Sequence, residues 1–506
     1  MDEVFRYFYE TENSLLLCNV SKFIYSNRNK KIAFIYCFWY NSNKKRDDIS
    51  MDIKDIFTKD YLNKEITVCG WIKNHRKQAN FGFISLSDGT IQDCLQVVYT
   101  KDLEDFEEIS KYHIGASVKV IGTVVESEGA GQDIEVKASK VILLGDCPED
   151  YPIQPKRHTR EYLRSMAYLR PRTNLFQAVF RVRSLAAYAI HEYFRKNNYV
   201  YVHTPLITTA DCEGSDQMFK LTTLNLNDLP MVDGHVDMSK DLFGKQAFIT
   251  GSGQLHGETF AHAFKKIYTF GPTFRTENSN TKTHANEFWM IEPEICFCDL
   301  EELMNIEEDF LKYIVSYILE NAKEEVEFFD KFVENGLKGK LTKLINSKFA
   351  RIDHKEAIDI LLKADNKWEF APTYDGDIAK EHERYLTSYF NGPVFIKNWP
   401  KDIKAYYMKL NDDNKTVAAV DLEVPGSGEL MGGSQREEDY DKLVARMKEL
   451  NIDTKEIEWY INLRKFGTTV HSGFGMGFER LIMYLTGIDN IRDVIPYPRT
   501  PGNCEY

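Results

Sequence analysis

The segment from Gly271 to Glu294, GPTFRTENSNTKTHANEFWMIEPE, constrains the fold of this chain more than any other. Its apolar and aromatic residues predict two strands, 270–276 and 287–291, and the polar residues 278–285 predict a loop between them. Such a hairpin lets a polar loop cross an exposed phosphate ligand. A surface hairpin with charged decoration is the alternative that this segment alone leaves open.

Charged and aromatic residues stand at defined places in this hairpin. Arg275, at the end of the first strand, carries a planar and permanently charged fork that suits a phosphate group. Because side chains alternate along a strand, Phe288, Met290 and Glu292 lie on one face. If a base rests on Phe288, Glu292 points into the same cavity.

A second segment, 470–487, reads VHSGFGMGFERLIMYLTG. Its three spaced glycines let the backbone approach a ligand closely, and Arg480 opens an amphipathic helix. A dinucleotide-binding fingerprint, with Asp493 as its acidic residue, is the alternative. We reject it because too little chain follows for the rest of a βαβ unit.

Together the two segments resemble motifs 2 and 3 of the class II aminoacyl-tRNA synthetases. The residues that match motif 2 are Phe274, Arg275, Glu277, His284, Glu287 and Phe288. The residues that match motif 3 are Gly473, Gly475, Gly477, Glu479 and Arg480. The runs ENSNT, EFWMIEPE and RDVIPYPRTPGN resemble bacterial-type asparaginyl-tRNA synthetases (class IIb) in particular, and the resemblance covers residues 51–506.

Composition limits the partners of the chain. Of its 506 residues, 43% are hydrophobic, which allows a large core and two or three domains. A net charge of −13 argues against general affinity for nucleic acid, so any RNA contact must come from local basic patches. Nine cysteines without a CxxC pair indicate a reducing, cytoplasmic compartment. No membrane association is expected, since the longest strongly apolar run, 32–40, cannot span a bilayer.

Residues 1–50 differ from the rest of the chain in being rich in aromatic residues. We expect Met51 to be the natural start, and the residues before it to be a disordered extension or an upstream translation artefact. A targeting peptide is the alternative, although acidic residues crowd the N-terminus and arginine is scarce.

Residues 51–148 predict an OB-fold β-barrel. The expected strands are 66–73, 82–87, 95–99, 117–125 and 133–144, with a short helix, 102–111, after the third. The basic run 73–77 gives this acidic protein a local positive edge. In the resembling family this barrel binds the anticodon, and Phe83 and Gln96 match the residues that read its central base. Without the family, Phe83 is equally a core residue.

Residues 149–172 form a polar, proline-containing connector that we expect to be a hinge, and 173–506 the catalytic domain. The predicted helix 173–198 and strand 200–203 resemble motif 1, which forms the homodimer in the family; an ordinary core helix is the alternative. Further helices are expected at 300–323 and 356–362, and two strands within 417–436. The predicted class is therefore α+β, with a mostly antiparallel sheet flanked by helices.

The resemblance also implies an amino-acid pocket. It assigns Glu213 to the α-amino group of the substrate, Gln254 to the amino acid and Arg436 to the substrate side chain. Aspartyl relatives carry a lysine near Gly257, so its absence here favours a neutral side chain.

Asparagine's carboxamide needs one donor and one acceptor. Arg436 supplies the donor, and Glu292, on the face of Phe288, is the predicted acceptor. Glu287 points to the opposite face and is the weaker candidate.

For ATP, the resemblance and the motif chemistry give the following set: Arg275, Glu277, His284, Phe288, Glu429, Gly477, Glu479 and Arg480. Arg275 and Arg480 are the expected catalytic residues. Asp421 and Glu429 are the expected ligands of a Mg²⁺ ion shared with the phosphates. Relatives have arginine before the motif 2 histidine where this chain has Thr283, so we expect a phosphate contact to be lost or moved, with Lys282 as its replacement.

The resemblance implies an asparagine–tRNA ligase that acts on ATP, L-asparagine and tRNA(Asn). An aspartyl or non-discriminating synthetase is the nearest alternative. An ammonia-dependent asparagine synthetase would not need the barrel, and a non-catalytic RNA-binding paralogue would not need Arg275, Glu429 and Arg480 together.

Overall fold

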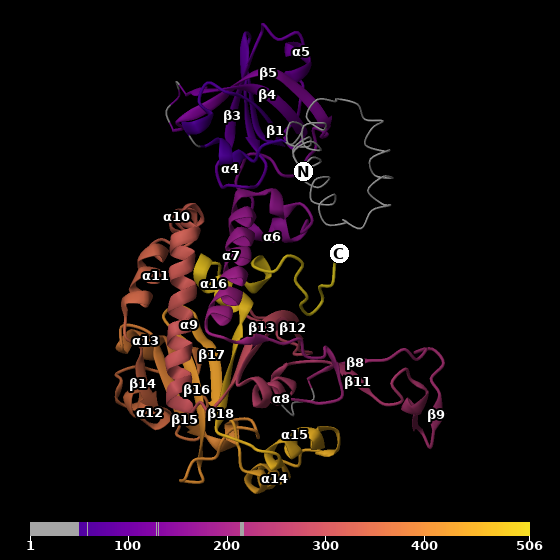
Figure 1. Ribbon diagram of the computed structural model, residues 1–506, viewed down its shortest axis with the longest axis vertical. Coiled ribbons are helices and arrows are strands. Elements are labelled where there is room, and N and C mark those ends of the chain that lie inside the picture. Colours follow the sequence, from indigo (N-terminus) through magenta and orange to yellow (C-terminus); the bar gives the residue numbers. More distant parts are fainter. Residues whose placement is uncertain (1–49, 58, 128, 130, 213–216) are drawn as a thin grey trace, which may run out of the picture. The chain divides into compact units, whose positions relative to one another are not determined.

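The computed structural model of the protein describes residues 50–57, 59–127, 129, 131–212 and 217–506. They form two compact units, divided between Lys156 and Arg157 (Figure 1). Residues 1–49 of the expected extension lie outside the described residues, and so does Glu213.

The first unit is a closed five-stranded barrel with strand order β1-β2-β3-β5-β4. Its strands are β1 (Glu65–Lys77), β2 (Phe81–Ser87), β3 (Leu95–Thr100), β4 (Ser117–Glu126) and β5 (Ile134–Gly145). The short helix α5 (Phe106–Ile109) follows the third strand, and α4 (Ile53–Ile56) precedes the first. The predicted OB-fold is confirmed.

Alternating burial explains why these residues form a barrel. Along β4, Val118, Val120, Gly122 and Val124 are buried while the residues that alternate with them are more exposed. Gly82 on β2 is required by packing, because a Cβ there would lie 2.2 Å from the ring of Tyr99. The strand β1 is longer than predicted and carries the basic run 73–77 along its final residues.

The second unit is built on an eight-stranded sheet with order β14-β15-β16-β17-β18-β13-β12-β6 (Figure 1). Its strands are β6 (Val200–Tyr201), β12 (Lys266–Phe274), β13 (Glu287–Cys296), β14 (Ala350–Asp353), β15 (Val394–Pro400), β16 (Thr416–Val424), β17 (Gly428–Gln435) and β18 (His471–Gly477). Only the two edge pairs, β14 with β15 and β6 with β12, are parallel. The prediction of a mostly antiparallel sheet is therefore confirmed.

Long helices cover one face of this sheet. They are α7 (Asn174–Lys196), α9 (Leu300–Asn321), α10 (Lys323–Phe332), α11 (Leu337–Asn346) and α16 (Phe478–Thr486), which share one core with the central strands. The predicted helices at 173–198, 300–323 and 356–362 are all present, the last as α12 (His354–Lys363). With the core on this face, the other face of β13 is left for the site.

Smaller elements complete the second unit. Helix α6 (Arg160–Arg164) lies in the expected hinge, and its Arg164 forms an ion pair of 2.6 Å with Asp493, so this part of the connector packs with the second unit. Helices α8 (Gln254–Phe264), α13 (Lys380–Tyr389), α14 (Tyr440–Glu449) and α15 (Glu458–Asn462) surround the sheet.

Residues 221–246 lie in a separate part of the second unit. A three-stranded sheet joins β7 (Ile207–Thr208), β11 (Ala247–Ile249) and β8 (Phe219–Leu221). Beyond it, β9 (Met231–Val232) and β10 (His235–Val236) form a hairpin that projects away from the eight-stranded sheet (Figure 1). Among the described residues, no helix is long and apolar enough to cross a membrane.

Candidate active site

The hairpin of β12 and β13 places the first arginine of the site. The two strands pair in register, with Thr273 opposite Phe288. Beyond them the Asn286 side chain donates hydrogen bonds to the carbonyl oxygens of Arg275, at 2.8 Å, and Glu277, at 3.0 Å. These two hydrogen bonds fix the backbone at Arg275, just beyond the end of the strand.

Strand alternation divides the residues of β13 between two environments. Ile291 and Ile295 pack into the helical core. Phe288 and Met290, on the other face, line a cavity, and Glu292 is buried further along the same face. The shared face predicted from the sequence is therefore present.

One cavity is lined by every residue that the sequence assigns to ATP. These residues are Arg275, Glu277, His284, Phe288, Glu429, Gly477, Glu479 and Arg480. They come from the β12–β13 hairpin, from β17 and from the β18–α16 junction, so three segments far apart in the sequence converge here.

The two arginines of this cavity lie close to Phe288 and Glu429. The guanidinium carbon of Arg275 lies 5.5 Å from the ring centroid of Phe288. Arg480 Nη1 lies 3.5 Å from Glu429 Oε2, and both side chains are well exposed. An aromatic face and two cationic planes thus border one space, as stacking on a purine requires.

Glu479 borders the cavity, but protein groups hold its carboxylate. Oε1 accepts a hydrogen bond of 2.7 Å from Arg183 of α7, and Oε2 accepts one of 2.9 Å from the backbone nitrogen of Trp289. The residue is buried. It therefore braces the hairpin against α7 and α16.

Thr283, which stands before the motif 2 histidine, is contacted by a cation that the sequence did not indicate. Lys282 forms an exposed ion pair of 2.8 Å with Asp489, and neither Lys282 nor Lys380 lines the cavity. Lys380 of α13 instead donates to Thr283 Oγ1 at 3.3 Å. Burial lowers the pKa of the neighbouring His284 below its usual value. Lys380 lies about a hundred residues from the motif, so spacing could not have indicated it.

Carboxylates gather beside Glu429. A Cβ on Gly432 would lie 3.1 Å from Glu429 Oε1 and 3.3 Å from Asp421 Oδ1, so these two oxygens lie close to one point. The other oxygen of Asp421 pairs with Lys404 at 2.5 Å. Burial, with the charge of Glu429, raises the pKa of Asp421 to about 6. The same two causes raise the pKa of Glu383 to about 7.

These carboxylates fit a hard divalent cation. Glu423, also on β16, is buried, and its Oε2 has no hydrogen-bond partner. Unpaired oxygens and mutual repulsion are both relieved by a cation with oxygen ligands. In the described part of the chain no group of three His, Cys, Asp or Glu side chains forms a complete metal site. Phosphate oxygens would therefore have to complete the coordination.

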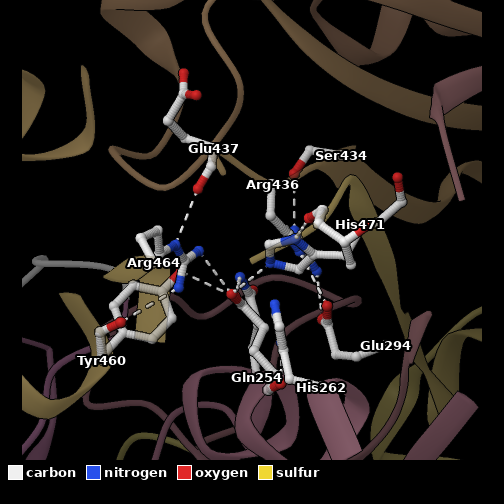
Figure 2. Close-up of polar contacts among 12 residues, drawn as sticks. Gln254, His262, Glu294, Ser434, Arg436, Glu437, Tyr460, Arg464 and His471 are labelled. Carbon is white, nitrogen blue, oxygen red and sulfur yellow. Dashed lines mark hydrogen bonds and ion pairs between the residues drawn. The ribbon is translucent and has the colours of Figure 1, made fainter. Parts of the chain in front are cut away.

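Beyond the cavity, the same sheet holds a buried ion pair (Figure 2). Arg436 Nη2 and Nε donate to the two oxygens of Glu294 at 2.6 and 3.2 Å, and Nη1 donates to Ser434 Oγ at 2.8 Å. Gly473 makes room for this carboxylate, because a Cβ there would lie 2.3 Å from Glu294 Oε1. One glycine expected to approach a ligand thus approaches a protein side chain.

Glu292 lies in a different hydrogen-bonding environment. Its Oε2 accepts from Gly253 N at 3.1 Å and from Thr269 Oγ1 at 2.9 Å, and its Oε1 accepts from Ser252. Arg436, the expected donor, pairs with Glu294 and not with Glu292. The sequence contained the signal for Glu294, which continues the alternation of Phe288, Met290 and Glu292.

Gly257 lies beside the ion pair of Arg436 and Glu294. A Cβ at Gly257 would lie 3.6 Å from Glu294 Cγ, so the residue that replaces the lysine of aspartyl relatives adjoins the buried pair. Gln254 opens α8 and is also buried. Its neighbours Glu258, Arg464 and His471 form a cluster that no sequence motif indicated.

In the first unit, the two predicted anticodon residues lie on adjacent strands. Arg76 of β1 stacks over Phe83, with its guanidinium carbon 4.9 Å from the ring centroid, and donates to Gln96 Oε1 at 3.1 Å. Phe83 is half-buried and points outward between buried neighbours. The barrel therefore presents an aromatic ring, an amide and a cation on one surface.

Comparisons with known proteins match both units. A family model described as tRNA synthetases class II (D, K and N) matches residues 159–501. A second, described as OB-fold nucleic acid binding domain, matches residues 66–144.

Individual relatives are similar over nearly the whole chain. The asparagine–tRNA ligase of Acholeplasma laidlawii is 59% identical over 449 residues, which is 88% of this chain and 97% of that ligase. The ligase of Acetivibrio thermocellus is 56% identical over 452 residues, or 89% and 97%. Among solved structures, asparaginyl-tRNA synthetase from Pyrococcus horikoshii, complexed with asparaginyl-adenylate, is 31% identical. It has a TM-score of 0.80 and covers 90% of this chain and 100% of its own.

Proposed function

This chain belongs to the class II tRNA synthetases (D, K and N), among the asparagine–tRNA ligases, and from this premise we propose how its residues divide the reaction. The reaction joins L-asparagine to tRNA(Asn) in protein synthesis. ATP first activates the carboxylate of asparagine to asparaginyl-adenylate and releases pyrophosphate. A terminal ribose hydroxyl of the tRNA then attacks the activated carbonyl.

The observation that carries the division is the continuity of one sheet face. Phe288 and Met290 line the cavity, and Glu292 and Glu294 continue the same face of β13 into a buried polar region. An amino acid bound in this region would have its carboxylate beside the α-phosphate of a nucleotide in the cavity. The chemistry needs no enzyme nucleophile, so catalysis consists of positioning and charge stabilisation.

In the nucleotide cavity, Arg275 neutralises the α-phosphate as negative charge builds on it. Phe288 and Arg480 enclose the adenine between an aromatic and a cationic plane. Glu277 reads the edge of the base, and His284 reaches the terminal phosphate. Gly477 keeps the backbone close to the nucleotide, and Glu479 holds the hairpin that carries Phe288.

We assign the displaced phosphate contact to Lys380. It is the cation that reaches Thr283, whereas Lys282 is held by Asp489. Mg²⁺ would be held by Glu429 and the free oxygen of Asp421, and it would supply neutralisation of the phosphate charge. Lys404 keeps the second oxygen of Asp421 in place.

For the substrate side chain, Arg436 donates to the carboxamide oxygen. Glu294 is the acceptor that adjoins Arg436, and Glu292 remains the acceptor predicted from strand alternation. Gln254 contacts the α-amino group together with Glu213, which lies outside the described residues. An aspartate in this pocket would add a carboxylate to buried carboxylates, with no lysine at Gly257 to offset it.

The barrel, residues 51–148, binds the anticodon of tRNA(Asn) in this proposal. Phe83 stacks on a base, Gln96 reads its edge, and Arg76 and its basic neighbours contact phosphates. The pairing of Arg76 with both residues supports the assignment.

The enzyme works as a homodimer formed through α7 and β6, in the cytoplasm. Exposed apolar side chains on these elements, Tyr188, Val200 and Tyr201, suit a subunit interface. No cysteine of the described residues forms a disulfide, which suits a reducing compartment. In this proposal the hinge is the part of residues 149–172 that precedes α6, and residues 1–50 are dispensable.

The test is pyrophosphate exchange driven by each amino acid. The wild-type enzyme should exchange with L-asparagine and not with L-aspartate. Glu294→Gln and Glu292→Gln should each be measured alone and with Gly257→Lys. Gly257→Ala controls for the added Cβ, which meets Ile267 at 3.3 Å.

If Glu294 accepts the carboxamide, Glu294→Gln lowers the asparagine-to-aspartate ratio by tenfold or more, out of the roughly 10⁴-fold that such pockets reach. Adding Gly257→Lys lowers the ratio further, whereas Gly257→Ala does not. A fall confined to Glu292→Gln would assign the acceptor to Glu292. Aspartate-driven exchange by the wild type would contradict the proposed substrate.

A further inference from the structure

We propose that Glu258 is a positioning residue for asparagine: it orients the side-chain amide of Gln254 so that the carbonyl oxygen faces the α-ammonium group of the substrate. The inference rests on the proposed function, in which Gln254 contacts the amino acid.

The orientation follows from the chemistry of the two side chains. Glu258 lies one helical turn after Gln254 on α8, and Gln254 Nε2 donates to Glu258 Oε1 at 3.2 Å. An ionised carboxylate only accepts hydrogen bonds, so the amide must turn its NH₂ group toward Glu258. The carbonyl oxygen of Gln254 is then left for a donor. An ammonium group has only donors to offer.

Three side chains hold the Glu258 carboxylate in place. Oε2 accepts from Arg464 Nη2 at 2.8 Å and contacts His471 Nε2 at 3.0 Å, while Oε1 accepts from Tyr460 at 2.9 Å. All four residues are buried. Burial alone would raise the pKa of Glu258, but Arg464 and His471 outweigh it and hold the pKa below its usual range.

The cluster is built around this single carboxylate. Arg464 also donates to the carbonyl oxygen of Glu437 at 2.9 Å and to Tyr460 (Figure 2). A buried charge is costly unless every one of its partners is placed, so a rigid network of this kind is stable only as a unit. It therefore holds the Gln254 amide in one of its two orientations.

The same cluster reaches the residues that bind the other end of the substrate. The carbonyl oxygen of His471 accepts from the backbone nitrogen of Arg436 at 2.8 Å, and Arg436 pairs with Glu294. Figure 2 shows Gln254, His471, Arg436 and Glu294 gathered in one buried region. One network thus sets the groups proposed for the α-ammonium and for the carboxamide.

A reversed amide would turn the NH₂ group of Gln254 toward the ammonium group. Two donors would then face each other, and one hydrogen bond to a charged group would be lost. Succinamate, which is asparagine without its amino group, would not feel the reversal. The ratio of asparagine to succinamate binding therefore reports the orientation of Gln254 separately from the shape of the pocket.

The experiment compares Glu258→Gln with the wild-type enzyme by pyrophosphate exchange. In Glu258→Gln, the amide oxygen of residue 258 can still accept a hydrogen bond from Arg464. Its NH₂ group must then face Gln254. We expect the KM for asparagine to rise roughly 10- to 100-fold, as for loss of a hydrogen bond to a charged group. The KM for ATP and the Ki of succinamate should stay within about twofold, a margin below the tenfold that 1.4 kcal/mol produces.

Glu258→Asp is the second variant. It keeps the charge beside Arg464 but withdraws the carboxylate from Gln254, so the same rise in KM is expected with less loss of stability. Glu325→Gln is the matched control. Glu325, on α10, is a buried glutamate that pairs with Arg181 of α7 at 2.6 Å, away from the pocket.

A double mutant with Gln254→Ala separates positioning from general damage. If Glu258 acts through Gln254, Glu258→Gln adds nothing to the KM for asparagine in the Gln254→Ala background. The proposal is overturned if the two effects multiply, or if succinamate weakens as much as asparagine. Failure of the wild type to exchange with asparagine would instead contradict the proposed function.

Discussion

Two arginines of the proposed active site, Arg480 and Arg436, stand in opposite surroundings. The side chain of Arg480 is 35% exposed and lies 3.5 Å from a Glu429 that is 44% exposed. The side chain of Arg436 is 5% exposed and lies 2.6 Å from a Glu294 that is 1% exposed. The guanidinium of Arg480 is accessible to a ligand, whereas the guanidinium of Arg436 is paired with a buried carboxylate.

In the proposed function, the difference reflects the two kinds of ligand. ATP brings its own charges, so loosely held cations can be matched by phosphate without first breaking a strong pair. Asparagine's side chain brings no net charge, so a pocket for it must be neutral before binding, and each buried charge must be paired. Selectivity on that side comes from the arrangement of donors and acceptors.

The largest expected effect is on the buried side. Arg436→Met leaves Glu294 buried without its partner, which should lower the free energy of unfolding by roughly 3–5 kcal/mol and abolish exchange with asparagine. Thermal or denaturant unfolding measures the first effect, and pyrophosphate exchange the second.

The double variant Arg436→Met with Glu294→Leu sharpens the contrast. It removes both charges, so most of the lost stability should return while activity stays absent. If the double variant were no more stable than Arg436→Met, the pairing would not be the reason for the loss.

The next effect is on the exposed side. Arg480→Ala or Arg275→Ala should cost about 2.7–4 kcal/mol of transition-state stabilisation in exchange, as for a preorganised charge-stabilising donor. Since Arg480 is exposed and loosely paired, its loss should change unfolding little. Near-normal exchange in Arg480→Ala would contradict its assignment. Arg446→Ala, on α14 and paired with Glu449, serves as the control.

The same contrast explains what could be predicted from the sequence. The ATP side is encoded in short segments, where strand alternation and glycine spacing place Arg275, Phe288 and Arg480. The buried side depends on pairings across the fold. Arg436 and Glu294 lie 142 residues apart, and Arg464 and Glu258 lie 206 apart.

Two contacts that the sequence did not indicate have a common physical cause. Arg436 met Glu294 because β13 and β17 both pair with β18, a register that no local pattern contains. Lys380 reached Thr283 because α13 packs near the motif 2 loop. Charged partners in a folded protein are chosen by topology, whereas periodicity reports only the face on which a residue lies.

The barrel gives a smaller effect that leaves the catalytic unit unchanged. Phe83→Ala should weaken tRNA charging at limiting tRNA by about 1–3 kcal/mol, the contribution of one stacked base, and leave exchange unaltered. Phe57→Ala removes another exposed aromatic ring of the same unit as the control. Equal charging by both variants would exclude Phe83 from anticodon binding.

The smallest effect concerns pH and the partly buried carboxylates beside Glu429. Because the folded-state pKa of Glu383, about 7, lies above its ordinary value, the protonated form is favoured in the folded protein. Its contribution to stability is full below pH 4.5 and is lost as pH rises toward 7. Asp421, with a pKa of about 6, adds a loss in the same direction.

Glu383→Gln should therefore flatten the decline of Tm between pH 5 and 8 by roughly 2 °C relative to the wild type. Glu324→Gln, an exposed glutamate on α10, should not. Mg²⁺ with ATP should stabilise the wild type more at pH 8 than at pH 5, because a cation binds the ionised carboxylates. If the Tm of Glu383→Gln and that of the wild type declined in parallel, repulsion among these carboxylates would not explain the loss of stability with rising pH.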